Sequence, residues 1–156
     1  MREMAGDLWE VAVALKADAI VITTNGFVKK NGEAVMGRGV AHQAKTRWPN
    51  LPFILGVHLA QGGNQVYPLC HAYSPAGPWI ISFPVKHNWW ERADPELIRV
   101  SAAQLLSMTE QPYYAFKTVV LPRPGCNNGR LVWEAVVRPI IAPILDDDRF
   151  VVVNNQ

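Results

Sequence analysis

The sequence predicts one α/β domain with helices packed on both faces of a sheet. Short runs of apolar and β-branched residues alternate with segments of helical periodicity, which is the order of elements in α/β domains. Neither an internal repeat nor a linker divides residues 1–156, and this length suits a single domain with a substantial core. Ligands of α/β sheets bind beyond the carboxyl ends of the strands, so the loops that follow strands are the first candidates for a site.

Five strands and four helices are expected from these patterns. Apolar runs bounded by turn residues predict strands at 19–23, 65–69, 79–83, 117–121 and 150–153. Helical spacing predicts helices at 39–47, 50–59, 94–108 and from about 131 onward. Residues 26–33 are polar and are expected to form a loop, and residues 73–78 a turn.

Local chemistry supports the last two helices. Asp94 can cap the helix at 94–108, Pro95 suits its first turn, and Glu96 places favourable charge there. In the final helix Pro139 and Pro143 are expected to produce a bend or an end. The apolar residues that recur there at helical intervals are Trp133, Val136, Val137, Ile140, Ile141 and Ile144.

Composition limits the function classes. Hydrophobic residues make up 49% of the chain and charged residues 18%, which excludes a disordered polypeptide. The net charge of +2 is too small to predict nucleic-acid binding by itself. Cys70 and Cys126 show no metal or redox spacing, no apolar run is long enough to cross a membrane, and residues 1–7 do not resemble a signal peptide. We therefore expect a soluble cytoplasmic protein.

Two glycine-rich loops, at 35–41 and 124–130, are the most informative feature of the chain. Each follows an expected strand and leads into an expected helix. Unpaired backbone N–H groups at a helix N-terminus favour an anion, and glycine lets the backbone approach it closely. One such loop is most often an ordinary turn, whereas two in a small domain predict a site for a nucleotide diphosphate.

The order of motifs resembles that of the macrodomains, which bind ADP-ribose. The motifs are Gly6-Asp7-Leu8, the strand that ends at Asn25, the loop 36–41 and the late loop 121–130, and together they span nearly the whole chain. The resemblance implies a three-layer α/β/α sandwich with a mixed central sheet of about six strands. Residues 82–89 (SFPVKHNW) and 124–134 (PGCNNGRLVWE) are similar to the branch of DarG-type antitoxins and the terminal ADP-ribose protein glycohydrolase.

Three features depart from that family. Residues 22–24 are Ile-Thr-Thr where many relatives have Asn and Ala-Ala, and the loop between Asn25 and Gly37 is longer than in DarG. Gly129 stands where the human-type glycohydrolase has its catalytic aspartate. This last difference argues against a lysine–aspartate mechanism but agrees with DarG.

The resemblance also implies a role for each motif residue. Asp7 would bond the adenine amino group, Leu8 would contact the base, and Asn154 would lie near the adenosine. Asn25 would bond the distal ribose and, with Lys86, form the catalytic pair. The residues expected to enclose the pyrophosphate are Gly37, Arg38, Gly39 and Val40 on one side, and Gly125, Cys126, Asn127, Asn128, Gly129 and Arg130 on the other.

Several of these residues have a simpler interpretation. Asp7 is equally expected as a helix cap, and Asn25 as a turn residue. Cys126 lies near an expected helix N-terminus, which lowers a thiol pKa, but it lacks a partner histidine and is interpreted as a packing residue. Arg38 and Arg130 could be solvated loop arginines.

Lys86 carries the sharpest hypothesis. It follows an apolar strand among aromatic residues, and burial there would lower its pKa and make it a base or nucleophile; the alternative is a surface lysine. His87 could assist proton transfer or lie at the surface. Trp89 and Trp90 could wall the cleft or stack on a base, with at least one expected in the core.

Three functions remain open at this stage. The first is a hydrolase that removes ADP-ribose from modified nucleic acid or protein, and the second is a reader that binds ADP-ribose without cleaving it. The third, a single-stranded nucleic-acid binder, is disfavoured by the small net charge. Neither a metal nor a cofactor is expected, the histidines show no ligand spacing, and a toxin partner cannot be inferred from the residues.

Overall fold

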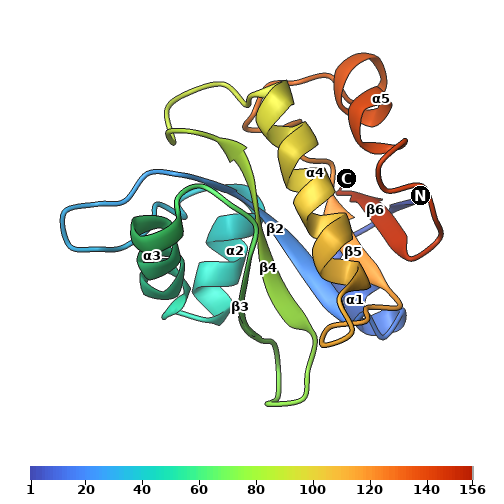
Figure 1. Ribbon diagram of the computed structural model, residues 1–156, viewed down its shortest axis with the longest axis horizontal. Helices are drawn as coiled ribbons and strands as arrows, with labels where there is room; N and C mark the ends of the chain where they lie inside the picture. The colour runs from blue at the N-terminus through green and yellow to red at the C-terminus, as the bar shows by residue number, and fades with distance from the viewer. Residues whose placement is uncertain (156) are drawn as a thin grey trace.

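The computed structural model describes residues 1–155, in which six strands form one sheet in the order β1-β6-β5-β2-β4-β3 (Figure 1). The sheet is mixed, because every neighbouring pair is parallel except β3 and β4. The strands are β1 (Arg2–Ala5), β2 (Ala19–Asn25), β3 (Tyr67–His71), β4 (Trp79–Lys86), β5 (Val119–Pro122) and β6 (Phe150–Asn154). The helices are α1 (Leu8–Ala14), α2 (Gly39–Arg47), α3 (Leu51–Gly62), α4 (Pro95–Glu110) and α5 (Arg138–Ile141), with a π-helical turn η1 (Trp133–Val137) before α5.

Two hydrophobic clusters, one on each face of the sheet, make this a three-layer α/β/α sandwich. Side chains alternate along β2, so that Val21 packs with α4 and α5, while Ile20 and Ile22 pack with α1, α2 and α3. Helix α4 lies in front of the sheet in the view of Figure 1. The predicted α/β/α sandwich with a mixed sheet of about six strands is therefore confirmed.

All nine predicted elements form, with shifted ends. Strand β4 continues to Lys86, three residues beyond the predicted end, although Pro84 has no N–H for a ladder bond. The Ser101 hydroxyl on α4 donates to the Pro84 carbonyl at 2.7 Å and supports the strand there. Asp94 caps α4 as expected, accepting a hydrogen bond from the Glu96 amide.

Two elements at the N-terminus escaped prediction. Strand β1 is mostly exposed and has no apolar run, so its only identifying feature is its parallel pairing with β6. Helix α1 begins after Asp7, whose Oδ1 accepts hydrogen bonds from the amides of Trp9 and Glu10, both at 3.0 Å. Asp7 is therefore a helix cap in this structure.

The last helical segment begins at Trp133, two residues later than expected, and is divided. Val137 donates to the Val132 carbonyl in the π-helical turn, and the α-helix proper starts at Arg138. Pro139 lies in the first turn of α5, where its missing N–H does no harm, and α5 ends before Pro143. The buried face was correctly anticipated for Trp133, Val137 and Ile141.

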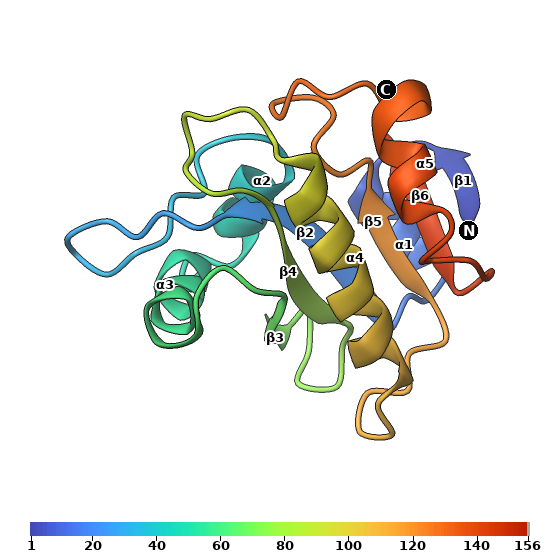
Figure 2. The same ribbon diagram turned by 45° about the horizontal axis from the view of Figure 1, so that its top comes forward.

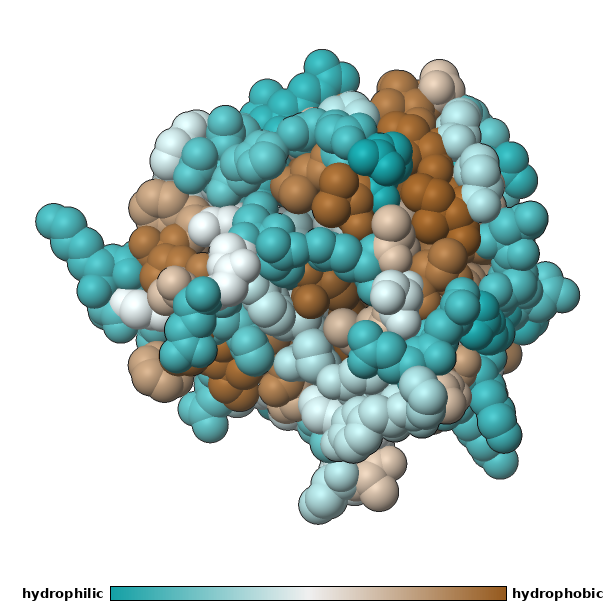
Figure 3. Space-filling model, in the orientation of Figure 1, coloured by the Kyte–Doolittle hydropathy of each residue, from teal (hydrophilic) through white to brown (hydrophobic). Residues whose placement is uncertain are grey.

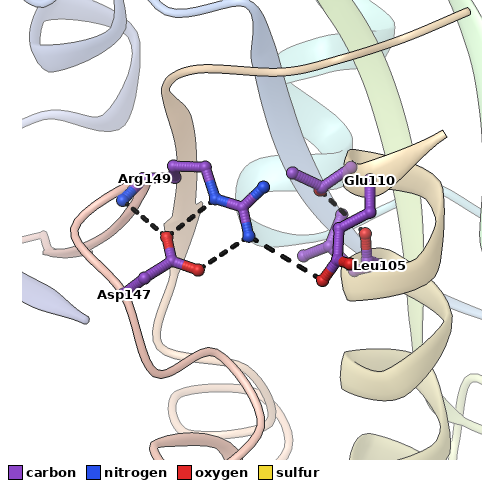
Figure 4. Close-up of polar contacts among 5 residues, drawn as sticks. Leu105, Glu110, Asp147 and Arg149 are labelled. Carbon is purple, nitrogen blue, oxygen red and sulfur yellow. Dashed lines mark hydrogen bonds and ion pairs between the residues drawn. The ribbon is translucent and has the colours of Figure 1, made fainter. Parts of the chain in front are cut away.

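An ion-pair group fixes the turn that leads into β6 (Figure 4). Arg149 Nε and Nη2 donate to the two carboxylate oxygens of Asp147 at 2.9 and 2.7 Å, and Nη2 also lies 3.8 Å from Glu110 at the end of α4. The Arg149 hydrogen bond lowers the pKa of Asp147 below its ordinary value. This group joins the final strand to the helix that covers it.

Among residues 1–155, none of the helices has the length and apolar character needed to cross a bilayer. On the face seen in Figure 3, hydrophobic residues form separate patches among hydrophilic side chains. Scattered exposure of this kind is ordinary for a protein surface.

Candidate functional site

A cleft of about 620 Å³ opens at the carboxyl ends of β2, β4, β5 and β6. Its volume is typical of a site for a small ligand. Both glycine-rich loops line it, and Figure 2 shows the loops that surround this end of the sheet. The predicted site residues that line it are Asn25, Gly37, Arg38, Gly39, Val40, Lys86, Gly125, Cys126, Asn127, Asn128, Gly129 and Asn154.

The first loop leads directly into α2, as predicted. Helix α2 begins at Gly39, and no side chain caps it, so its first amides remain available to an anion. Gly39 has φ +59°, and a Cβ there would lie 3.1 Å from Asn128 of the second loop. The two loops therefore face each other across the cleft at close range.

The second loop leads into the last helical segment two residues later than predicted, and that segment begins as the π-helical turn η1. Leu131 and Val132 separate it from η1, and its conformation is fixed by hydrogen bonds from Leu131 N to Gly125 O and from Ala93 N to Gly129 O. Within residues 1–155, the amides of Asn127, Asn128 and Gly129 donate to no backbone carbonyl. Successive unpaired amides of a loop can bind an anion without a helix dipole.

Gly129 is required by packing, and its substitution is expected to destabilise the fold. A Cβ on Gly129 would collide with the carbonyl oxygen of Gly125 and would lie 2.7 Å from the Ala93 Cβ. We expect Gly129→Ala to lower the free energy of unfolding by about 1–3 kcal/mol, as overpacking does. Urea denaturation would measure this loss, with Gly37→Ala as the control, because a Cβ on Gly37 meets no atom within 4 Å. Equal stability of the two variants would contradict this account.

Lys86, the last residue of β4, lines the cleft and also an adjoining hollow of about 320 Å³. Its Nζ donates to the carbonyl of Trp89 at 3.4 Å. Burial lowers the pKa of Lys86 below its ordinary value, and the positive charges of Arg130 and Arg38 lower it further. Lys86 is therefore a partly buried lysine in the wall of the cleft.

A register shift places Asn25 beside this lysine. Thr24 pairs with Pro84, but the next residue, Asn25, pairs with Lys86. The Asn25 side chain donates from Nδ2 to Val35 O and accepts at Oδ1 from the Phe27 amide, both at 3.0 Å. Asn25 thus shapes the turn after β2 in addition to lining the cleft.

Trp89 and Trp90 are both exposed, so the expectation that at least one lies in the core was wrong. Their exposed fractions are 48% and 53%, and the two rings meet edge to face. Trp90 also contacts Phe27, which joins the loop after β4 to the loop after β2. The smaller hollow is lined by Arg38, Lys86, Trp89, Trp90, Asn127, Asn128 and Arg130.

The surroundings of Cys126 and His87 bear on the reactive roles that were considered for them. The Cys126 thiol is not at a helix N-terminus, and burial raises its pKa to about 11, so it packs in the cleft wall as an unreactive thiol. His87 does not line the cleft; its Nε2 lies 2.7 Å from Asp94 Oδ2, and this hydrogen bond lowers the pKa of Asp94. The proposed proton-transfer role of His87 therefore has no geometric support.

At the far end of the cleft, the structure adds Arg123, and it places Trp133, which was expected on the buried face of the last helix, in the cleft wall. Asp7 and Leu8 do not line the cleft, but the neighbouring Gly6 amide donates to the Asn154 carbonyl at 3.0 Å. Arg123 and Trp133 do line this end, beside Asn154. Only the position of Arg123 and Trp133 after β5 could have indicated from the sequence that they line the cleft, since an arginine and a core tryptophan are common in any domain.

Among residues 1–155, no group of three or more His, Cys, Asp or Glu side chains is placed to hold a metal ion. The cleft is lined by apolar residues together with amides, glycines and the cationic side chains of Lys29, Arg38, Lys86 and Arg123, and no carboxylate side chain is among its described residues. Such a site is suited to an anionic ligand.

The fold is that of the macrodomains, whereas the sequence alone matches no protein-family model and no curated protein. The macrodomain of Streptomyces coelicolor superimposes with a TM-score of 0.67 at 18% identity, covering 99% of this chain and 97% of the other. Within this class the chain is similar to DarG. The DarG macrodomain of Mycobacterium tuberculosis is 24% identical with a TM-score of 0.75, and the match covers 98% of this chain and 96% of the other. The DarG macrodomain of Thermus aquaticus is 25% identical with a TM-score of 0.73, and the match covers 99% of this chain and 97% of the other.

A further similar structure contains a ligand. Thermosipho africanus DarTG in complex with ADP-ribose superimposes with a TM-score of 0.80 at 17% identity over 100% of this chain. This chain spans only 42% of that longer protein.

Proposed function

We propose that this protein binds ADP-ribose in the cleft between its two glycine-rich loops. The observation that carries the proposal is the pair of anion-binding backbones, at Gly37–Val40 and Asn127–Gly129, facing each other between Lys86 and Asn154. A diphosphate between the loops would leave one sugar at each end of the cleft. The similarity to the DarG macrodomains, and to DarTG in complex with ADP-ribose, supports the same ligand.

In this arrangement the distal ribose lies at Lys86 and Asn25, and the adenosine half lies toward Asn154. Arg38 and Arg130 contribute positive charge near the pyrophosphate. Asp7, with Oδ1 engaged in capping α1, would approach the base through Oδ2, and Leu8 would remain a packing residue.

Titration calorimetry with ADP-ribose, with AMP as the comparison ligand, tests this proposal. We expect ADP-ribose to bind at least tenfold more tightly than AMP, because only the former fills both the diphosphate and the distal-ribose positions. Failure of both ligands to bind would show that the glycine loops have only a structural role.

We further propose that the protein hydrolyses ADP-ribose from a modified nucleic acid or protein, with Lys86 as the reactive group. The lowered pKa of Lys86 increases the fraction of neutral amine. That amine could attack the anomeric carbon of the distal ribose, so that a C–N bond forms as the bond to the modified group breaks; the modified group leaves with the electron pair and takes up a proton, and water then hydrolyses the lysine adduct. Alternatively, the amine could take the proton of a neighbouring ribose hydroxyl, whose oxygen attacks the anomeric carbon and displaces the same group, and water then opens the cyclic product.

This chemistry predicts a specific pH dependence. Arg130 lowers the pKa of Lys86, so Arg130→Met is expected to raise that pKa and reduce the neutral amine present at any given pH. The rise of kcat with pH should therefore shift to higher pH in Arg130→Met, measured at saturating substrate. Arg47→Met is the control, since Arg47 lies over the Trp9 ring outside the cleft. An unshifted profile would exclude Lys86 as the titrating group.

One observation favours a reader of ADP-ribose instead of a hydrolase. No carboxylate lines the described cleft, so Lys86 has no acidic partner for proton transfer. Turnover assays with ADP-ribosylated DNA and ADP-ribosylated protein separate the two functions. Tight binding of ADP-ribose with no release from either substrate would identify the reader.

A further inference from the structure

Arg123 lies at the end of the cleft opposite Lys86, and none of the roles assigned above involves it. It directly follows β5 and lines the cleft with Trp133 and Asn154. Lys86 ends β4 and Arg123 directly follows β5, two strands away in the order β4-β2-β5, so at about 4.8 Å per strand their backbones lie about 10 Å apart. The inference rests on the proposed function: with the distal ribose at Lys86, the adenosine half of the ligand extends to Arg123.

The guanidinium of Arg123 is held over an aromatic ring. Its central carbon lies 4.9 Å from the centre of the Trp133 ring, and Nη2 lies 3.8 Å from Glu3 Oε1. Glu3 is itself fixed by hydrogen bonds from Trp133 Nε1 at 3.0 Å and Arg138 Nε at 2.8 Å. The Arg138 hydrogen bond is the main reason that the pKa of Glu3 is lowered, so the carboxylate stays charged beside Arg123.

The guanidinium of Arg123 has hydrogen-bonding capacity that the described residues do not use. Within residues 1–155 the buried Nε of Arg123 has no hydrogen-bond partner. The distance of 3.8 Å from Nη2 to Glu3 Oε1 is too long for a hydrogen bond. The side chain is 29% exposed, in the wall of the cleft. A planar cation with an indole on one face offers its other face to a second aromatic ring.

We propose that Arg123, backed by Trp133, is the base-binding surface of the cleft, on which the adenine ring of ADP-ribose stacks. Stacking recognises the π face of a base and does not read its exocyclic groups, so Arg123 selects for a ligand that carries a base, whichever base it is. It is therefore the residue that makes the site prefer a nucleoside diphosphate over a phosphorylated ribose.

Two substitutions separate stacking from simple charge attraction. Arg123→Met removes both the charge and the planar group, whereas Arg123→Lys keeps the charge without the plane. Arg138→Met is the matched control, because Arg138 bonds the same Glu3 carboxylate but does not line the cleft. Thermal unfolding of each variant shows whether it is folded before binding is measured.

Binding of ADP-ribose by calorimetry, and of AMP and ribose 5-phosphate by competition, forms the test. We expect both Arg123 variants to bind ADP-ribose and AMP about tenfold more weakly, which is the range of a cation–π contact, and to bind ribose 5-phosphate as the wild type does. Arg138→Met should match the wild type for all three ligands.

Other outcomes overturn the inference. Full ADP-ribose affinity in Arg123→Lys would mean that Arg123 acts only through its charge, on the pyrophosphate. Equal losses of affinity for AMP and ribose 5-phosphate would mean that Arg123 does not contact the base. A comparable loss in Arg138→Met would mean that the Glu3 group acts through the fold. A wild-type protein that fails to bind ADP-ribose would overturn the proposed function as well, whereas unchanged affinity in every variant would overturn only this inference.

Discussion

Gly37→Glu is expected to abolish ADP-ribose binding while leaving the fold intact. Gly37 lines the cleft, and a Cβ at this position meets no atom within 4 Å. Its backbone is not in the left-handed region, so a side chain causes no strain there. The new carboxylate would face the pyrophosphate; two like unit charges 4 Å apart repel by about 4 kcal/mol at an effective dielectric constant near 20, which is close to a thousandfold in affinity.

Calorimetry and thermal unfolding measured together test this expectation. Gly37→Gln is the matched control, because it has nearly the same size without the charge, and it should retain much more affinity than Gly37→Glu. Undiminished binding by Gly37→Glu would remove the first loop from the site. A large fall in melting temperature would instead mean that Gly37 is needed for folding.

Lys86→Ala is expected to lose turnover and keep binding. A positioned proton-transfer group contributes about 10²–10⁴-fold to a rate, so kcat should fall by at least a hundredfold. ADP-ribose affinity should stay within a factor of about five, since a partly exposed charge contributes about 1 kcal/mol or less. The part of Lys86 that matters is its ability to lose a proton, so Lys86→Arg should be as inactive as Lys86→Ala.

Release of ADP-ribose from a modified substrate measures kcat in these variants. Lys45→Ala, on an exposed part of α2 outside the cleft, should match the wild type. Full activity in Lys86→Ala would exclude lysine chemistry. Loss of both binding and turnover would assign Lys86 to ligand binding alone.

The fold was largely predictable because its central strands are buried on both faces. Continuous apolar runs such as Ala19–Thr23 identify such strands without any knowledge of their partners. Strand β1 was not predictable, since an exposed edge strand of four residues owes its conformation to pairing with β6. The π-helical turn before α5 was equally hidden, because it depends on how Trp133 and Val137 pack in the core.

The cleft was predictable where backbone geometry is encoded by glycine, and less so elsewhere. Both glycine loops line it, and Lys86 lies there with a lowered pKa, as the desolvation argument anticipated. The exposure of Trp89 and Trp90 was missed, because composition places tryptophan inside whereas a loop can hold it at the surface. Arg123 was missed because its partner Trp133 is ten residues away and Glu3 lies at the other end of the chain.

The register shift at the end of β2 divides the chain into segments with different freedom to change length during evolution. Because Asn25 pairs with Lys86 and passes over Val85, a residue gained or lost between Pro84 and Lys86 would turn the lysine toward the side of the sheet where Val85 packs in the core. The loop after β2 extends past α3 in Figure 1; its exposed tip is residues 29–31, and it carries one isolated strand bridge, between Val28 and Ala34. Descendants of this sequence can therefore lengthen or shorten that loop, and so alter the surface beside the cleft, while inheriting the same pairing of asparagine and lysine.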